Sequence, residues 1–261
     1  MSQAPISQQA RIAALAALTL VVAVASLLLP PFAQPQSYHT FADHRGFLGI
    51  PNFGDVVSNI PFAIVGVWGL MFLVSARASS HFVDQHERWP YIIAFLGMAL
   101  TFFGSSYYHL HPDNARLVWD RLPMTLVFMS IVAAVIAERV NLRAGLWLLP
   151  LLLLVGIASV LQWYASELRG AGDLRFYAAV QAYSALVLLV SLAFSSSYTR
   201  SWSFAVVVGF YALAKALELL DKPIFALAHI VSGHTLKHLA AAGAGFWILR
   251  MLQRRLVKAI K

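Results

Sequence analysis

Hydrophobic residues form long, nearly continuous runs along the chain, and polar residues gather in the gaps between these runs. A helix that crosses a bilayer needs about 20 mostly apolar residues. Eight runs approach or meet this length, over residues 12–29, 56–76, 90–110, 122–137, 144–164, 176–194, 202–220 and 236–252. No run alternates like a barrel strand, and backbone amides in hydrocarbon must be paired within the segment, so each run is expected to be a helix.

The pattern predicts an all-α integral membrane protein, built as a bundle of seven transmembrane helices with one additional N-terminal transmembrane helix. Residues 1–34 hold the additional helix, residues 35–54 form a polar connector, and residues 55–261 form the seven-helix bundle. The first run could also be a cleaved signal peptide, because Arg11 precedes it and small residues follow near Ala33. A retained helix is favoured, since the run is long and no clean small-x-small site follows Pro30 and Pro31.

Composition supports membrane insertion and narrows the possible partners. The chain is 60% hydrophobic and 11% charged, whereas soluble domains carry about 25% charged residues. The net charge of +8 does not indicate nucleic-acid binding, because most basic residues stand singly between apolar runs. Membrane lipids are the expected surroundings, and no obligate protein partner is inferred.

The distribution of basic residues predicts the orientation of the bundle. With eight spans, both termini lie on one side of the membrane, and that side collects more Lys and Arg, including the basic C-terminal tail. The positive-inside rule then places both termini in the cytoplasm. The short loops suggest a bacterial cytoplasmic membrane.

Three polar groups interrupt the apolar runs at span ends. Ser105 and His109 close the third span, Asp120 opens the fourth, and His234 and His238 open the eighth. The predicted orientation brings all three groups close to the outer face of the membrane. Since the chain has no cysteine, a metal must use His, Asp or Glu. Three neutral imidazoles and a water match an open tetrahedral zinc site of the catalytic type.

Each polar group also has a purely structural explanation. His109 could be an interfacial histidine, Asp120 a helix N-cap, and Ser105 a hydrogen-bonding contact between helices. The spacing of His234 and His238 places them on one helix face, about 6 Å apart, but this spacing alone is only moderately specific for a metal. The metal site is favoured because the topology brings the groups together.

The combined motif resembles that of the alkaline ceramidase family. It consists of Ser105 and His109 four residues apart, Asp120 eleven residues later, and the distant pair His234 and His238. Residues 52–59 also resemble the segment that opens the ceramidase core, and the resemblance covers about residues 52–252. The wider superfamily of seven-helix putative membrane hydrolases includes adiponectin/progestin-type receptors and haemolysin-III-like proteins.

The resemblance implies a zinc-dependent hydrolase that cleaves the N-acyl bond of ceramide or a related lipid amide to a fatty acid and a long-chain base. His109, His234 and His238 would bind Zn²⁺, Asp120 would transfer protons, and Ser105 would hydrogen-bond the water or the developing oxyanion. Alternatives are a receptor-like or haemolysin-III-like member with another lipid, a bis-histidine haem cytochrome, and a transporter that uses Lys215 and Glu218.

The resemblance also raises the question of a calcium site, because eukaryotic members bind calcium through an acidic stretch before the first core helix. The corresponding residues here are Asp43, Asn52 and Asp55, where Asn52 replaces an expected Glu. The spacing matches poorly, and Asp43 and Asp55 could instead cap turns or pair with Arg45.

A second polar cluster lies in the seventh span. Lys215 and Glu218 are three residues apart and are expected to form a structural ion pair close to Asp221, or else to bind the polar head of a substrate. Lys237 lies between the two histidines of the last motif and is expected to point away from them.

Overall fold

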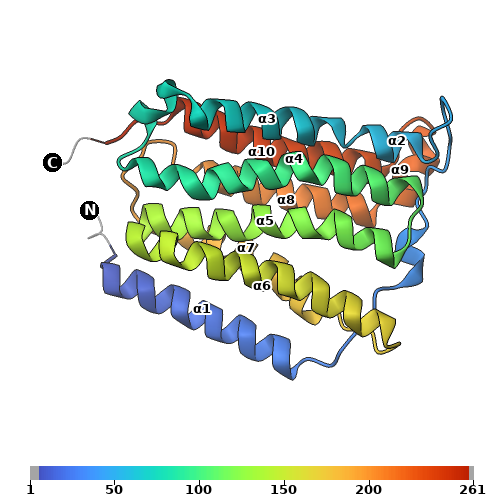
Figure 1. Ribbon diagram of the computed structural model, residues 1–261, viewed down its shortest axis with the longest axis horizontal. Helices are drawn as coiled ribbons and strands as arrows, with labels where there is room; N and C mark the ends of the chain where they lie inside the picture. The colour runs from blue at the N-terminus through green and yellow to red at the C-terminus, as the bar shows by residue number, and fades with distance from the viewer. Residues whose placement is uncertain (1–5, 259–261) are drawn as a thin grey trace.

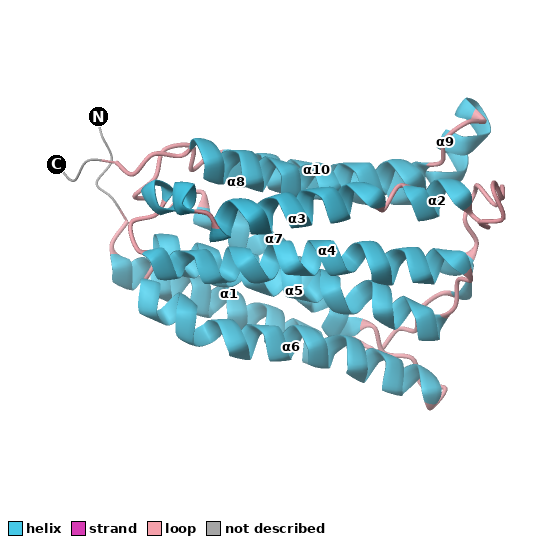
Figure 2. Cartoon of the chain, turned by 45° about the horizontal axis from the view of Figure 1, so that its top comes forward, coloured by secondary structure: helices cyan, strands magenta, loops and turns pink. Residues whose placement is uncertain are grey.

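The computed structural model describes residues 6–258, and over this range α-helices are the main regular elements (Figure 2). The helices are α1 Gln8–Leu28, α2 Phe53–Val57, α3 Ile60–Val74, α4 Arg88–Leu110, α5 Asn114–Arg139, α6 Leu142–Leu168, α7 Arg175–Ser191, α8 Ser203–Leu219, α9 Asp221–Ala228 and α10 Gly233–Arg254. The prediction of an all-α protein is confirmed.

The long helices lie side by side along the long axis of the molecule (Figure 1). The start of α1 and the end of α10 lie at one end of this bundle, at the left of Figure 1, and α2 and α9 lie at the opposite end. We call the end with α2 and α9 the site end.

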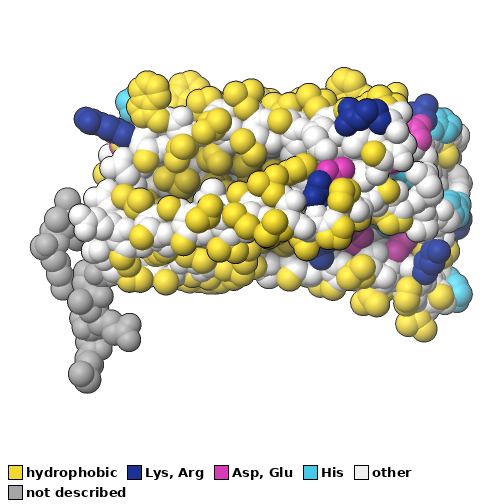
Figure 3. Space-filling view, turned by 90° about the horizontal axis from the view of Figure 1, so that it is seen from below, with side chains coloured by type: hydrophobic (Ala, Val, Ile, Leu, Met, Phe, Trp, Pro, Cys, Tyr) yellow, Lys and Arg dark blue, Asp and Glu magenta, His cyan; other side chains and the backbone are white. Residues whose placement is uncertain are grey.

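Five helical segments of the described chain are long and apolar enough to cross a membrane: Gln8–Leu28, Phe53–Val74, Gln85–Leu110, Asn114–Arg139 and Leu142–Leu168. A sixth is obtained if α8 and α9, which meet at a bend of 73°, count as one span. The predicted number of eight therefore stays a prediction. Much of the surface between the two ends is hydrophobic, and a small group of side chains of both charges lies in a hollow of it (Figure 3).

Two helix boundaries differ from those expected. The predicted second span is divided into α2 and α3 around Ser58 and Asn59, since Pro61 lacks an N–H and favours the start of a new helix. Helix α5 begins at Asn114, several residues before the predicted start at residue 122. Its N-cap is Asp113, whose carboxylate accepts the Arg116 N–H at 2.7 Å, so Asp120 is not a cap.

Helix α1 packs mainly on α7, at one edge of the bundle. The Thr19 hydroxyl lies 2.9 Å from the Tyr183 hydroxyl, and the Arg11 guanidinium donates to the Arg139 carbonyl at 2.8 Å. The additional helix therefore lies on the side of the bundle, away from the polar groups of α4 and α10.

Candidate metal centre

Three buried histidines meet at the site end of the bundle. His109 comes from the last turn of α4, and His234 and His238 come from the first turns of α10. Their ring centroids are 4.8 to 4.9 Å apart, and one ring nitrogen from each lies within 4.8 Å of the other two. The structure therefore confirms the predicted convergence, and the three residues could hold a metal ion.

Two glycines allow the helices to approach closely enough to form this cluster. A Cβ atom on Gly104 of α4 would lie 1.9 Å from the Trp119 carbonyl oxygen of α5. A Cβ atom on Gly233 would lie 2.3 Å from the Leu217 carbonyl oxygen of α8. Since larger residues would push the helices apart, these positions fix the distances between the polar groups of α4, α5, α8 and α10.

The surroundings of the histidines suit a metal centre. The Ser58 hydroxyl contacts Nδ1 of His238 at 2.7 Å, which leaves Nε2 of that ring for a ligand. Nδ1 of His109 is buried and has no hydrogen-bond partner in the described chain. Nitrogen ligands about 2.0–2.1 Å from a tetrahedral zinc ion lie about 3.4 Å apart, so small side-chain rotations would close the observed cluster around an ion. The three histidines and their surroundings therefore fit a zinc ion.

Backbone contacts hold the cluster from outside. The Asn52 amide donates to the His109 carbonyl oxygen at 2.8 Å, and Asp221 accepts the His234 N–H at 2.8 Å. The same Asp221 carboxylate accepts the Ala42 N–H at 2.8 Å, so it also fastens the connector to the start of α10.

Phe41 of the connector covers the histidines. Its ring centroid lies 4.7 Å from that of His109 and 4.5 Å from that of His234, and its side chain is buried. An apolar ring at this position separates the cluster from the outer loops. Phe41 was not predicted from the sequence, because nothing in a Pro- and Gln-containing loop indicates which aromatic side chain folds back onto the histidines.

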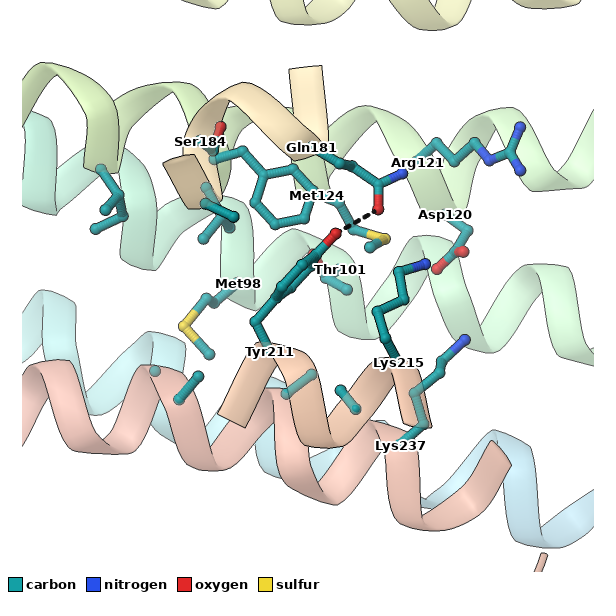
Figure 4. Close-up of a pocket in the computed structure, with 18 of the residues that line it drawn as sticks. Met98, Thr101, Asp120, Arg121, Met124, Gln181, Ser184, Tyr211, Lys215 and Lys237 are labelled. Carbon is teal, nitrogen blue, oxygen red and sulfur yellow. Dashed lines mark hydrogen bonds between the residues drawn. The ribbon is translucent and has the colours of Figure 1, made fainter. Parts of the chain in front are cut away.

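A long cavity runs from His238 of the cluster into the bundle. It has a volume of about 670 Å³, and Ser105, Asp120 and His238 are among the residues that line it. Asp120 lies near Arg121, Lys215 and Lys237, and these charged residues mark the polar end of the cavity (Figure 4). Its inner part is lined mainly by apolar residues such as Phe95, Met98, Ile131, Leu188 and Ile248. The structure therefore brings Ser105 and Asp120 to the cavity that reaches the metal cluster, as predicted.

Lys237 does not point away from the site, so that expectation is wrong. Its ammonium lies 3.1 Å from Nε2 of His234 and 2.9 Å from Glu218, and it points into the cavity toward Asp120 (Figure 4). The signal was present in the sequence, because residues three apart on a helix are neighbours and Lys237 follows His234 by three. Lys215 pairs with Glu218 at 2.8 Å, as expected.

The candidate calcium residues are already occupied by other contacts. Arg45 makes an ion pair with Asp43 at 2.8 Å, and this guanidinium holds the pKa of the Asp43 carboxyl below its ordinary value. Asp55 accepts a hydrogen bond from the Thr235 hydroxyl at 2.8 Å, and Asn52 is committed to His109. Within residues 6–258, the group of three or more His, Asp or Glu side chains placed to bind a metal is the histidine cluster. For Asp43, the structure therefore fits the ion pair with Arg45 and not a calcium site.

In comparisons with known proteins, no protein-family model and no curated protein matches this chain. The function is therefore inferred from the residues and the geometry of the site.

Proposed function

We propose that the protein is a zinc-dependent intramembrane hydrolase that cleaves the N-acyl bond of ceramide-like lipid amides. The observation that carries this proposal is the meeting of three buried histidines with Asp120 and Ser105 at the polar end of a long apolar cavity. Three histidines with an open fourth position are a ligand set of catalytic zinc enzymes. An adjacent carboxylate is the remaining group that amide hydrolysis requires.

His109, His234 and His238 would hold the zinc ion. When bound, such an ion activates water and polarises a carbonyl group. Asp120 is buried on α5 and takes part in no ion pair among the described residues, so its carboxylate is free to accept the proton of the water and deliver it to the leaving amine. Ser105 is buried and lines the same cavity, and it would donate a hydrogen bond to the oxygen of the amide.

The cavity suits the acyl chain of the substrate. Its lining extends along α4 from Ser105 back to Ala94 and along α10 from Lys237 to Ile248. Eleven residues of helix rise about 16 Å, and an extended chain advances about 1.2 Å per bond. The cavity therefore accommodates an acyl chain of about a dozen carbons in hydrocarbon surroundings while its amide lies at the polar end.

Two other functions differ from this proposal, one in its geometry and one in its chemistry. A bis-histidine haem needs a flat slot between two imidazoles, whereas the three rings stand edge-on to one another at less than 5 Å. A receptor-like protein would keep the metal and the cavity but would not turn over an amide, and turnover separates it from a hydrolase.

Replacement of Asp120 by Asn tests the proposed role of the carboxylate. The variant should retain zinc but lose about a hundredfold or more of the hydrolysis rate, since a positioned proton-transfer group contributes about 10²–10⁴-fold. The measurement is fatty-acid release from a panel of lipid amides, including ceramide, by purified protein in detergent. Asp113→Asn, which alters the α5 N-cap and the Arg116 ion pair outside the cavity, is the control.

Full turnover by Asp120→Asn on every accepted amide would contradict the assigned role. A wild-type protein that binds zinc and hydrolyses no lipid amide would support a receptor-like function instead.

A further inference from the structure

The polar end of the cavity carries more positive than negative charge. Arg121, Lys215 and Lys237 line it together with two carboxylates, Asp120 and Glu218. Three cations less two anions leave one positive charge, before the charge of any metal ion is counted. Glu218 is shared, because it pairs with Lys215 at 2.8 Å and with Lys237 at 2.9 Å.

Arg121 forms no ion pair with either of these carboxylates. It is 4% exposed, and no ion pair joins it to a carboxylate within residues 6–258. One of its terminal nitrogens donates to the Gln34 side chain, and the other, Nη1, is buried and has no hydrogen-bond partner there.

Aromatic rings hold the Arg121 guanidinium in place. It lies 4.2 Å from the ring centroid of Trp163 and 4.7 Å from that of Tyr177. Cation–π contacts stabilise such a charge in part and fix its orientation. They do not supply a counter-charge, and a buried guanidinium at membrane depth is expensive unless it is paired. The fixed side chain with a free donor is therefore suited to receive an anion.

A second cation, Lys215, lies at the exposed side of the polar end. The side chain of Lys215 is 46% exposed while it lines the cavity, so it stands between the surroundings and the polar end. Helix α8, which carries it, packs mainly on α10 and less on α7. Lys215 is more exposed than Lys237, Glu218 and Arg121, so a lipid headgroup that enters the cavity would reach it most easily.

We propose that the polar end of the cavity binds an anionic oxygen group of the substrate, so that the preferred amides carry a carboxylate or a phosphate on the amine half, close to the bond that is cleaved. Arg121 and Lys215 are the specificity-determining residues. This inference rests on the proposed function and deepens it, because neutral ceramide supplies no such group.

Binding of amphiphiles that cannot be hydrolysed tests the proposal without any turnover. The probes are (dodecylthio)acetate, in which a thioether replaces the amide and a carboxylate follows it, and its neutral methyl ester. Calorimetry on the full-length protein in a non-ionic detergent gives both dissociation constants. The wild type should bind the acid about tenfold or more tightly than the ester, as expected for hydrogen bonds to charged groups.

Variants assign the preference to the proposed residues. Arg121→Gln should bring the acid and the ester to near-equal affinity, Arg121→Lys should keep most of the preference, and Lys215→Met should reduce it. Arg116→Gln is the matched control, since Arg116 pairs with Asp113 outside the cavity and should leave the ratio unchanged. If Arg121→Gln does not fold, the ratio of the acid and ester dissociation constants in the wild type and in Lys215→Met still tests the proposal.

Dodecanoate distinguishes the two possible sources of the anion. If Arg121→Gln weakens the binding of dodecanoate but not that of (dodecylthio)acetate, Arg121 binds the released fatty acid. That result overturns the assignment of Arg121 to the headgroup. Equal binding of acid and ester by the wild type also overturns it. If the wild type hydrolyses neutral ceramide and binds the acid and the ester equally, the proposed function stands and only the preference for an anionic group is contradicted.

Discussion

At the scale of single residues, the candidate metal centre depends on side chains that contact the histidines and would not contact an ion. Ser58 is buried and fixes the ring of His238, and Asn52 holds the backbone of His109. The spacing of polar residues, taken together with the predicted topology, indicated that His109, His234 and His238 converge, and the structure shows this convergence. Ser105 and Asp120 line the adjoining cavity, and their roles stay predictions. Ser58 could not be predicted, because its partner is 180 residues away in the sequence.

Replacement of Ser58 by Ala should weaken metal binding by about tenfold to a hundredfold, the usual effect of removing a group that orients a histidine ligand. Competition with a chromogenic chelator measures the zinc affinity of the purified protein. Ser80→Ala, an exposed serine at the opposite end of the bundle, is the control. A Ser58→Ala protein with wild-type zinc affinity would mean that Ser58 does not orient the ligand.

At the scale of elements, the connector is part of the site. It was expected to be a polar link between the first helix and the bundle, yet Phe41 covers the histidines and Tyr38 donates to Glu218 at 3.1 Å. Its composition predicts a loop correctly, since Pro, Gln and Gly do not favour a helix. The path of that loop is set by distant contacts with α8 and α10, which the local sequence does not encode in any readable pattern.

The Asp43–Arg45 ion pair within the connector predicts a pH-dependent stability difference. Because Arg45 lowers the pKa of Asp43 in the folded protein, the pair stabilises the fold above the unfolded pKa, and this contribution is lost as the pH falls through the folded value. Wild type should therefore melt slightly higher than Arg45→Gln at neutral pH, and the gap should narrow below about pH 4, where only the Arg45 hydrogen bonds to the His229 and Ile230 carbonyls still contribute to it.

Thermal unfolding of both proteins in detergent between neutral pH and acid measures this gap. Arg77→Gln, an exposed arginine that forms no ion pair in the described chain, is the control and should melt like the wild type. A gap that widens toward acid would show that Asp43 does not owe its ionisation to Arg45.

At the scale of the whole molecule, hydropathy was enough to predict an all-helical bundle and the approximate place of most helices. It could not show the break between α2 and α3 or the bend between α8 and α9, because both arise from local caps and from packing at the site end. The number of membrane crossings and their direction stay predictions, which the arrangement of charges motivates.

Single cysteines test the direction, since the chain contains none of its own. Ala171 is exposed in the loop between α6 and α7 at the site end, and Ser80 is exposed between α3 and α4 at the opposite end. A membrane-impermeant maleimide added to intact cells should label Ala171→Cys at once and Ser80→Cys only after permeabilisation. The reverse pattern would place the metal centre at the cytoplasmic face.

We propose that His109, His234 and His238 together hold one zinc ion. Elemental analysis of the purified protein tests it most directly, for the wild type, for His109→Ala, for a double variant with His234→Ala and His238→Ala, and for His86→Ala, which removes an exposed histidine far from the cluster. We predict about one zinc per chain in the wild type and in His86→Ala, and almost none in the other two. A wild-type protein without zinc, or cluster variants that retain it, would contradict the claim.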